Sequence, residues 1–584
     1  MDVRRLLSLF VADFPESQTG VFMKFSKLPA LIAKGQSVCC TLLFCFASSS
    51  ADTTLLKNVN GYTLDENRNL KRFNAIQFTG DKIDRTFNAD SESLNFANYD
   101  EIIDINNHLL IPGLIDSHGH ILSFGLSLLR TDLVGASSET EAAGRVEEFA
   151  SKNPTLSWIQ GRGWNQVLWE NKEFPSIKSL DETTTTKPIW LTRVDGHAGW
   201  ANSAAIEIAG VTEFTEDPEG GQIIRDPSGK PTGVFVDNAM NLIRQHIPAP
   251  TLQEQKVALQ TAMLELAAYG LTSVHDAGVS STTIRAYKEL AKDGPLPIRV
   301  NVMIAATDEF FEDRLAEGKF RDDHDTLTIN SVKIAADGAL GSRGAALIDD
   351  YSDSHGHTGL LLHSQERMQY FMRAGMNAGF QINTHAIGDN ANMLVLNNYE
   401  QLILETNSRN LRHRIEHAQI LRYEDISRFA SLGVIPAMQA THATSDKNMA
   451  IDRLGETRIQ GAYAWRKLLD SGTRIANGSD FPVESPNPFF GLHASVTRQD
   501  RKNQPDNGWF PEERLSIEEA FASFTIDAAY AGHQERIVGT LESGKKADFI
   551  VVDLDIFSAP DTQIWEAKPL QTWVNGVQIS NQDP

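Results

Sequence analysis

Apolar residues gather in short, near-continuous runs from about residue 111 onward, and polar or helical segments separate these runs. Runs of this kind are typical of parallel strands that helices cover on both faces. Helical patterns lie between them, for example at Gln253–Tyr269 and Ser364–Ala378. Eight strands that alternate with helices predict a (β/α)₈ barrel of the TIM type. The predicted strands are Leu114–His118, Thr272–Asp276, Arg299–Met303, Ser331–Ala335, Gln381–His385, Arg414–His417, Val434–Met438 and Arg474–Asp480.

The two ends of the chain have a different pattern, in which apolar and polar residues alternate over short stretches. Leu55–Thr63 and Ala75–Gly80 are examples near the start, and Asp548–Asp553 and Thr572–Gly576 resemble them near the end. Such alternation, with turn signals between the stretches, is typical of short strands. We therefore predict that residues 52–110 and 536–584 form the two parts of one small β-sandwich. The barrel then occupies residues 111–535.

A long interval separates the first two predicted barrel strands. His118 and Thr272 are 154 positions apart, and a loop inside a compact domain is far shorter. We therefore predict an inserted subdomain at about residues 140–250. It contains five of the nine tryptophans, which leave two interpretations open: a small aromatic core, or a cover over a substrate pocket. These tryptophans are Trp158, Trp164, Trp169, Trp190 and Trp200.

Residues 1–51 have the order of a secretory signal that begins late. A basic stretch starts near Met23, the apolar run Val38–Ala47 follows, and small residues lead to Ala51. This order predicts an over-extended start, then a signal peptide, and so a secreted or periplasmic protein. The apolar run is too short to span a bilayer. A buried N-terminal helix is the alternative.

Charge and cysteine content narrow the function classes. The formal net charge is −23, so the bulk field of the chain does not attract nucleic acid or anionic membranes. The three cysteines, Cys39, Cys40 and Cys45, lie within seven positions, which excludes a disulfide framework or a cysteine metal site spread through the domain. Beyond the N-terminal segment, no run reaches 18 apolar residues. A metal in this protein is therefore held by nitrogen and oxygen.

The ends of several predicted strands carry metal-competent side chains. His118 and His120 stand two positions apart in Ile111–His120, so both side chains leave the strand on the same side. His385, His417 and Asp480 end three other strands. Catalytic residues of such barrels come from several strand ends, and imidazole with carboxylate suits zinc or a related divalent ion. Such an ion lowers the pKa of a bound water towards about 7. Asp480 would take a proton from that water and pass it to a leaving amine.

Several motifs in order carry a resemblance to a known family. The chain resembles the amidohydrolase superfamily, and within it the YtcJ-like, amidohydrolase-3 branch, which includes N-substituted formamide deformylase. The resemblance runs from about residue 53 to 580. Its matching stretches are Pro112–His120, Val274–Gly278, Lys333–Arg343, Thr384–Asp389, Arg414–Ala418, Gly478–Pro482 and Gly544–Val551.

The resemblance implies a distorted (β/α)₈ barrel with a small β-sandwich and a divalent metal centre. It implies metal ligation by the residues that match His118, His120, His385 and His417, with Asp480 as both ligand and acid/base. In many relatives a carboxylated lysine bridges two metals, and Lys333 stands at the matching strand end. The alternative is an unmodified Lys333 that pairs with Asp337 or with substrate. One zinc ion or two therefore stays open.

Further residues are predicted to surround the substrate or support the ligands. His197, His275, Arg343 and His442 are expected in substrate binding, although His275 would also fit as a lining residue and Arg343 as the partner of an acid. Glu416 and Asp389 are candidates to orient neighbouring ligands.

The function predicted from these residues is metal-dependent hydrolysis of a non-peptide C–N bond in an amide, formamide or cyclic amide. One alternative is an aminohydrolase that deaminates a heterocycle, against which Lys333 counts because such relatives usually lack that lysine. Another is a secreted metal- or solute-binding barrel without turnover. The expected partner is a small-molecule substrate. The oligomeric state stays open, with a homodimer among the alternatives.

Overall fold

The structure is a computed structural model that describes residues 52–582 apart from 90–94, 167–168, 184–185, 194–197, 219–220 and 342. The predicted start and signal peptide, residues 1–51, lie outside the described residues. None of the helices in the described part of the chain has the length and apolar character needed to cross a membrane.

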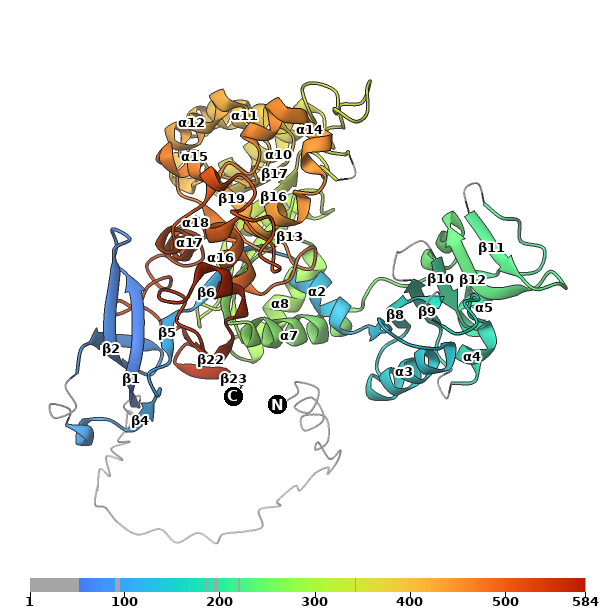
Figure 1. Cartoon of the computed structure of the whole chain (residues 1–584), viewed down its shortest axis with the longest axis horizontal. Helices are drawn as coiled ribbons and strands as arrows, with labels where there is room; N and C mark the ends of the chain where they lie inside the picture. Colours follow the sequence, from blue (N-terminus) through green and yellow to red (C-terminus); the bar gives the residue numbers. More distant parts are fainter. Residues whose placement is uncertain are drawn as a thin grey trace, which may run out of the picture.

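Eight parallel strands form the centre of the molecule (Figure 1). Hydrogen bonds between the first and last strand regions bring the two edges of this sheet together. The Asp480 backbone N–H donates to the His118 carbonyl at 2.7 Å, and that of His120 donates to the Phe481 carbonyl at 2.9 Å. The predicted barrel is therefore confirmed. Its strands are β6 (Leu114–Gly119), β13 (Leu271–Val279), β14 (Arg299–Ala305), β16 (Leu327–Ala335), β17 (Gln381–Ala386), β18 (Arg414–His417), β19 (Ile435–Gln439) and β20 (Ala476–Gly478).

Helices follow most of these strands, and their starts carry local signals. Thr251 caps α7 (Leu252–Ala268), where Glu254 completes a capping box. Ser364 caps α10 (Gln365–Asn377), where its side chain accepts a hydrogen bond from the Arg367 backbone N–H. Apolar faces of these helices pack on the buried strands. The other helices around the barrel include α2 (Ile121–Leu128), α8 (Ser281–Asp293), α10 (Gln365–Asn377), α11 (Asp389–Thr406), α12 (Tyr423–Leu432), α13 (Ala440–Asp446), α15 (Trp465–Asp470) and α16 (Pro488–Thr497).

The two ends of the described chain share a second sheet, as predicted. Strand β5 (Leu109–Pro112) pairs with β21 (Phe549–Val552) in antiparallel register. Asp548, just before β21, accepts two hydrogen bonds from the fully buried Arg299 at the start of β14, and this pair joins the sheet to the barrel. The remaining strands of the sheet are β1 (Thr53–Leu64), β2 (Leu70–Thr79), β3 (Lys82–Phe87), β4 (Glu101–Asp104), β22 (Pro569–Val574) and β23 (Val577–Asn581).

The insert after the first barrel strand forms a separate lobe beside the barrel (Figure 1). Its five tryptophans are buried in clusters made of the insert's own residues. Trp164 and Trp169 also donate indole hydrogen bonds to backbone carbonyls of the same lobe. The aromatic-core interpretation therefore describes these tryptophans. The lobe contains strands β7 (Thr131–Asp132), β8 (Ile159–Trp164), β9 (Ile189–Arg193), β10 (Ala198–Ala201), β11 (Gly221–Arg225) and β12 (Pro231–Asp237), with helices α3 (Glu139–Lys152), α4 (Ile177–Asp181) and α5 (Ser203–Ala209).

Candidate metal centre

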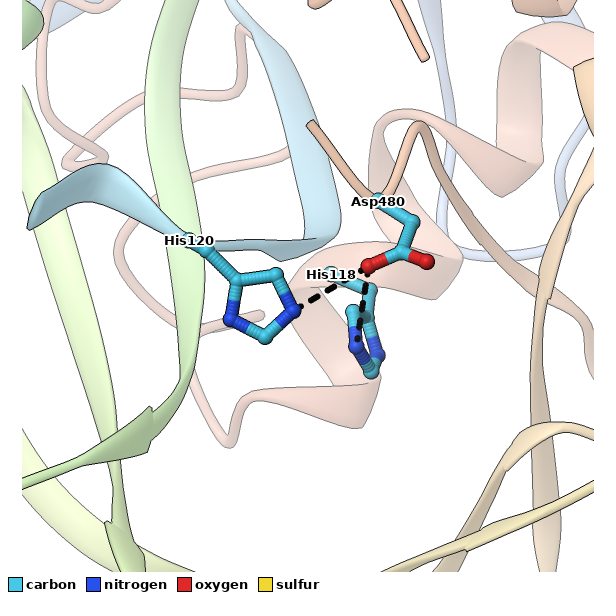
Figure 2. Close-up of side chains that lie close together, drawn as sticks. All are labelled: His118, His120 and Asp480. Carbon is cyan, nitrogen blue, oxygen red and sulfur yellow. Dashed lines mark ion pairs between the residues drawn. The ribbon is translucent and has the colours of Figure 1, made fainter. Parts of the chain in front are cut away.

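Side chains from three strand ends meet at the carboxyl edge of the barrel. Figure 2 shows His118, on β6, and His120, which directly follows β6, pointing toward the carboxylate of Asp480, which follows β20. Oxygen Oδ1 of Asp480 lies 3.1 Å from His120 Nε2 and 3.6 Å from His118 Nε2. The ring of His417, at the end of β18, lies 4.9 Å from that of His118. Four of the predicted ligands thus come together.

Three of these imidazoles are anchored through the nitrogen that faces away from the cluster. His118 Nδ1 bonds to the Glu416 carboxylate, His120 Nδ1 to the Ala277 carbonyl at 2.9 Å, and His417 Nδ1 to Gln439 Oε1 at 2.7 Å. Each oxygen accepts, so Nδ1 carries the proton and Nε2 keeps its lone pair. This is the tautomer in which a histidine binds a metal through Nε2 while an outer oxygen orients its ring.

The protonation states of the cluster also suit metal binding. Burial lowers the pKa of His118 to about 4, and the nearby Lys333 charge acts in the same direction. Burial holds the pKa of His417 well below its ordinary value. Burial acts to raise the pKa of Asp480, but the neighbouring histidines, His120 first among them, outweigh burial and hold that pKa below its usual range. Neutral imidazole and ionised carboxylate are the forms that bind a cation.

Lys333 lies beside this cluster, at the end of β16. Its Nζ is 3.0 Å from His118 Nε2, and burial lowers its pKa to about 8. Asp337, the alternative partner, accepts backbone hydrogen bonds from Ala346, Ile387 and Gly388. A lowered pKa increases the share of free amine, the form that carboxylation requires.

His385 and His442 complete the group of rings. His385, on β17, has its ring 4.5 Å from that of His417, but its Nε2 lies 3.4 Å from Asp337 Oδ1. His442, on α13, has its Nε2 3.7 Å from Asp480 Oδ2. Both Nε2 atoms are buried and have no hydrogen-bond partner among the residues that the structure describes. Buried polar atoms in proteins usually have a partner, and a bound ion is one of the groups that can serve as one. The donors present therefore fit a divalent cation.

Within the described ranges, two sets of three residues have ligand atoms that all lie within 4.8 Å of one another. The first set is His118, His120 and Asp480, and the second is His417, His442 and Asp480. Neither set contains His385 or Lys333, which the sequence predicted as ligands. His442, predicted to contact substrate, belongs to the second set instead.

A buried charge network supports the first set from inside the barrel. Arg414 donates to both oxygens of Glu416, at 2.8 and 2.9 Å, and to His275 Nδ1 at 2.9 Å. Glu416 thus holds His118 while Arg414 holds Glu416, which matches the supporting role expected for this glutamate. His275 is fully buried against Arg414, so the structure places it inside the barrel and away from a substrate at the mouth.

The other predicted residues lie outside the cluster or outside the described chain. Arg343 forms a bidentate ion pair with Asp353. This agrees with the alternative prediction, in which Arg343 pairs with an acidic side chain. The Asp389 carboxylate accepts a hydrogen bond from the Ile348 backbone N–H and not from a ligand histidine. His197 is among the residues that the structure does not describe.

Strained backbone turns two of the ligands toward the centre. His417 has φ of 73° and Asp480 has φ of 61°, a region that side chains other than glycine seldom adopt. For Asp480 this conformation ends β20 at Gly478, although the predicted strand ran to Asp480. Such strain clusters at functional sites, where the surrounding structure holds it in place.

Sequence reasoning missed the structural roles of three residues that shape the site. Asp116 accepts hydrogen bonds from the His118 backbone and from the Ser479 backbone and hydroxyl, which ties the two barrel edges together. Gln439 anchors His417, and Asp337 supports the loop after His385. Asp116 and Asp337 stand two and four positions from predicted ligands, and a period-two search along each strand end would have flagged Asp116.

Comparison with known proteins assigns the family. The model of the amidohydrolase family matches residues 101–580, most of the chain. The chain belongs to this family. The amidohydrolase is 32% identical to the putative amidohydrolase YtcJ of Bacillus subtilis, over 82% of this chain and 90% of that protein. It is 27% identical to N-substituted formamide deformylase of Arthrobacter pascens, over 82% of this chain and 89% of the relative. A crystal structure of an uncharacterized metal-dependent hydrolase from Pyrococcus furiosus superposes with a TM-score of 0.71 at 26% identity, over 87% of this chain and 100% of that one.

Proposed function

We propose that this amidohydrolase uses a divalent ion, zinc in the first instance, to hydrolyse a non-peptide C–N bond in an amide, formamide or cyclic amide. The observation that carries the proposal is the first set of ligands: two anchored imidazoles whose Nε2 atoms converge on Oδ1 of an ionised Asp480. A solute-binding barrel has no need of an ionised carboxylate so placed. Two similar proteins support the choice. One is an N-substituted formamide deformylase, and the other is an uncharacterized metal-dependent hydrolase.

The residues divide the work as follows. His118 and His120 would hold the ion through Nε2, and Asp480 would contribute Oδ1. When bound there, a divalent ion would supply Lewis-acid chemistry, lowering the pKa of a water and polarising a carbonyl. Asp480 Oδ2 accepts a proton from the attacking water and then delivers it to the leaving nitrogen, a transfer typically worth 10²–10⁴-fold in rate. Glu416 and Ala277 keep the two imidazoles in the ligand tautomer.

Lys333 carries a second part of the proposal. Its amine nitrogen lies 3.0 Å from His118 Nε2, and burial lowers its pKa to about 8. More of the amine is therefore unprotonated and available for carboxylation by carbon dioxide. The product is a carboxylate, which can bind a cation, whereas an ammonium cannot. This residue also favours amide hydrolysis over heterocycle deamination.

The decisive experiment replaces Asp480 by asparagine. The asparagine keeps the shape and one oxygen but cannot take up the proton, so kcat for hydrolysis of a panel of N-formyl and N-acyl amines should fall by about 10²-fold or more. Metal content, measured by elemental analysis, should remain. Asp389→Asn is the matched control, because Asp389 bonds to the Ile348 backbone outside the cluster. Activity that survives in the Asp480 variant would refute the mechanism, and release of ammonia from a heterocycle would favour deamination.

A further inference from the structure

We propose that His442 is a ligand of a second divalent-ion site, which it forms with His417 and Asp480 Oδ2. Neither the position of His442 after the seventh barrel strand nor the family resemblance predicted a metal ligand there. The inference rests on the proposed function only for its effect on activity; the site itself rests on the geometry of these three residues.

The three side chains approach one another as ligands do. His442 Nε2 lies 3.7 Å from Asp480 Oδ2, and the ligand atoms of all three residues lie within 4.8 Å of one another. Zinc bonds of 2.0–2.2 Å in tetrahedral geometry place neighbouring ligand atoms about 3.4 Å apart. The observed separation is close to that spacing and exceeds the 2.7–3.2 Å of an N–H···O hydrogen bond. The separation therefore leaves room for an ion that both groups could bind.

The free nitrogen atoms point to the same conclusion. His417 donates Nδ1–H to Gln439, so its Nε2 lone pair is the atom left for a ligand bond. His442 Nε2 is buried and has no hydrogen-bond partner in the described part of the chain, although the side chain as a whole is 13% exposed. The rings of His417 and His442 lie nearly parallel, at 17° and 5.9 Å between centroids. Both imidazoles can thus present Nε2, and their ligand atoms lie within 4.8 Å of each other and of an Asp480 carboxylate oxygen.

Asp480 links this second site to the first. Its Oδ1 faces His118 and His120, whereas its Oδ2 faces His442. In the proposed function Oδ2 is the atom that accepts the proton. An ion bound at the second site would occupy the Oδ2 lone pair that otherwise accepts the proton, so filling this site should slow hydrolysis. The second ion is therefore inhibitory, and its site is the weaker of the two because it shares a carboxylate that the first ion already polarises.

A metal titration tests the site without an activity assay. Metal-stripped full-length enzyme is titrated with Co²⁺, with the stoichiometry followed by calorimetry and by the visible absorption of the bound ion, and repeated with Zn²⁺. We expect two ions per chain in the wild type and one in His442→Gln. His442→Asp, which restores a ligand atom, should regain the second ion. His533→Gln is the matched control, a partly buried histidine bonded to the Leu411 carbonyl outside both ligand sets.

The possible results separate the inference from the proposed function. A His442→Gln variant that binds as many ions as the wild type would overturn the inference, as would a wild type that binds a single ion at every metal concentration. In the activity arm, wild-type turnover of an N-formyl amine should rise with the first equivalent and fall with the second, and the fall should vanish in His442→Gln. A rise with the second equivalent would overturn the inhibitory assignment. If no amide is hydrolysed at all, the proposed function fails while the stoichiometry still decides the site.

Discussion

Replacement of Glu416 by glutamine tests whether the buried carboxylate controls the metal centre through His118. Glu416 accepts the His118 Nδ1 hydrogen bond and two hydrogen bonds from Arg414, and all three side chains are almost completely buried. Glutamine keeps one accepting oxygen but removes the charge opposite Arg414. Loss of one partner from a buried ion pair costs about 3–5 kcal/mol of stability. Loss of an outer carboxylate that orients a ligand histidine lowers metal affinity about 10–100-fold, or roughly 1.4–2.8 kcal/mol.

The two effects are measured separately. Competition with a chromophoric chelator gives the zinc affinity of the metal-stripped protein, and thermal unfolding with a chelator present gives the loss of stability without metal. Glu424→Gln is the control, since Glu424 forms an exposed ion pair with Arg422 on α12 and its loss should change stability by less than about 0.5 kcal/mol. A folded Glu416→Gln variant with wild-type zinc affinity would show that the Nδ1 contact does not hold His118 for the ion. If glutamine prevents folding, Glu416→Asp, which keeps the charge, allows the same affinity measurement.

Three more predictions follow from other buried groups. Asp548→Asn leaves the Arg299 charge buried without its partner, so the free energy of unfolding should fall by about 3–5 kcal/mol and the unfolding midpoint should fall with it. Zinc affinity should stay unchanged. An unchanged midpoint would contradict the role of this pair. Burial lowers the pKa of His413 to about 3, so below about pH 6.5 only the unfolded chain takes up this proton and wild-type stability falls as the pH drops. By about pH 4.5 this amounts to roughly 2–3 kcal/mol, which His413→Gln should largely abolish in thermal scans at the two pH values. Metal-loaded wild type exchanged with ¹³C-bicarbonate should show a carbamate resonance that Lys333→Met lacks, and its absence from the wild type would disprove carboxylation.

The sequence by itself determined the barrel and the strand ends that carry the candidate ligands. Buried parallel strands need apolar residues on both faces. Each barrel strand therefore corresponds to a nearly continuous apolar run in the sequence, which makes it predictable. The side chains of two histidines two positions apart leave a strand on the same side, whatever surrounds them. The sequence alone therefore predicts that His118 and His120 face one site. The exact strand ends were less certain, because the turn at Asp480 depends on a positive φ that the bonds across the closed barrel hold in place.

Tertiary structure alone decided how the ligands group around Asp480. Glu416 reaches His118 across 298 positions of sequence, and His442 rather than His385 turns its Nε2 toward the shared carboxylate. The sequence likewise does not predict that His275 is buried against Arg414. Periodicity gives the face and the end of a strand, whereas the rotamer of a side chain depends on neighbours that other strands supply. Those neighbours meet only when the barrel closes.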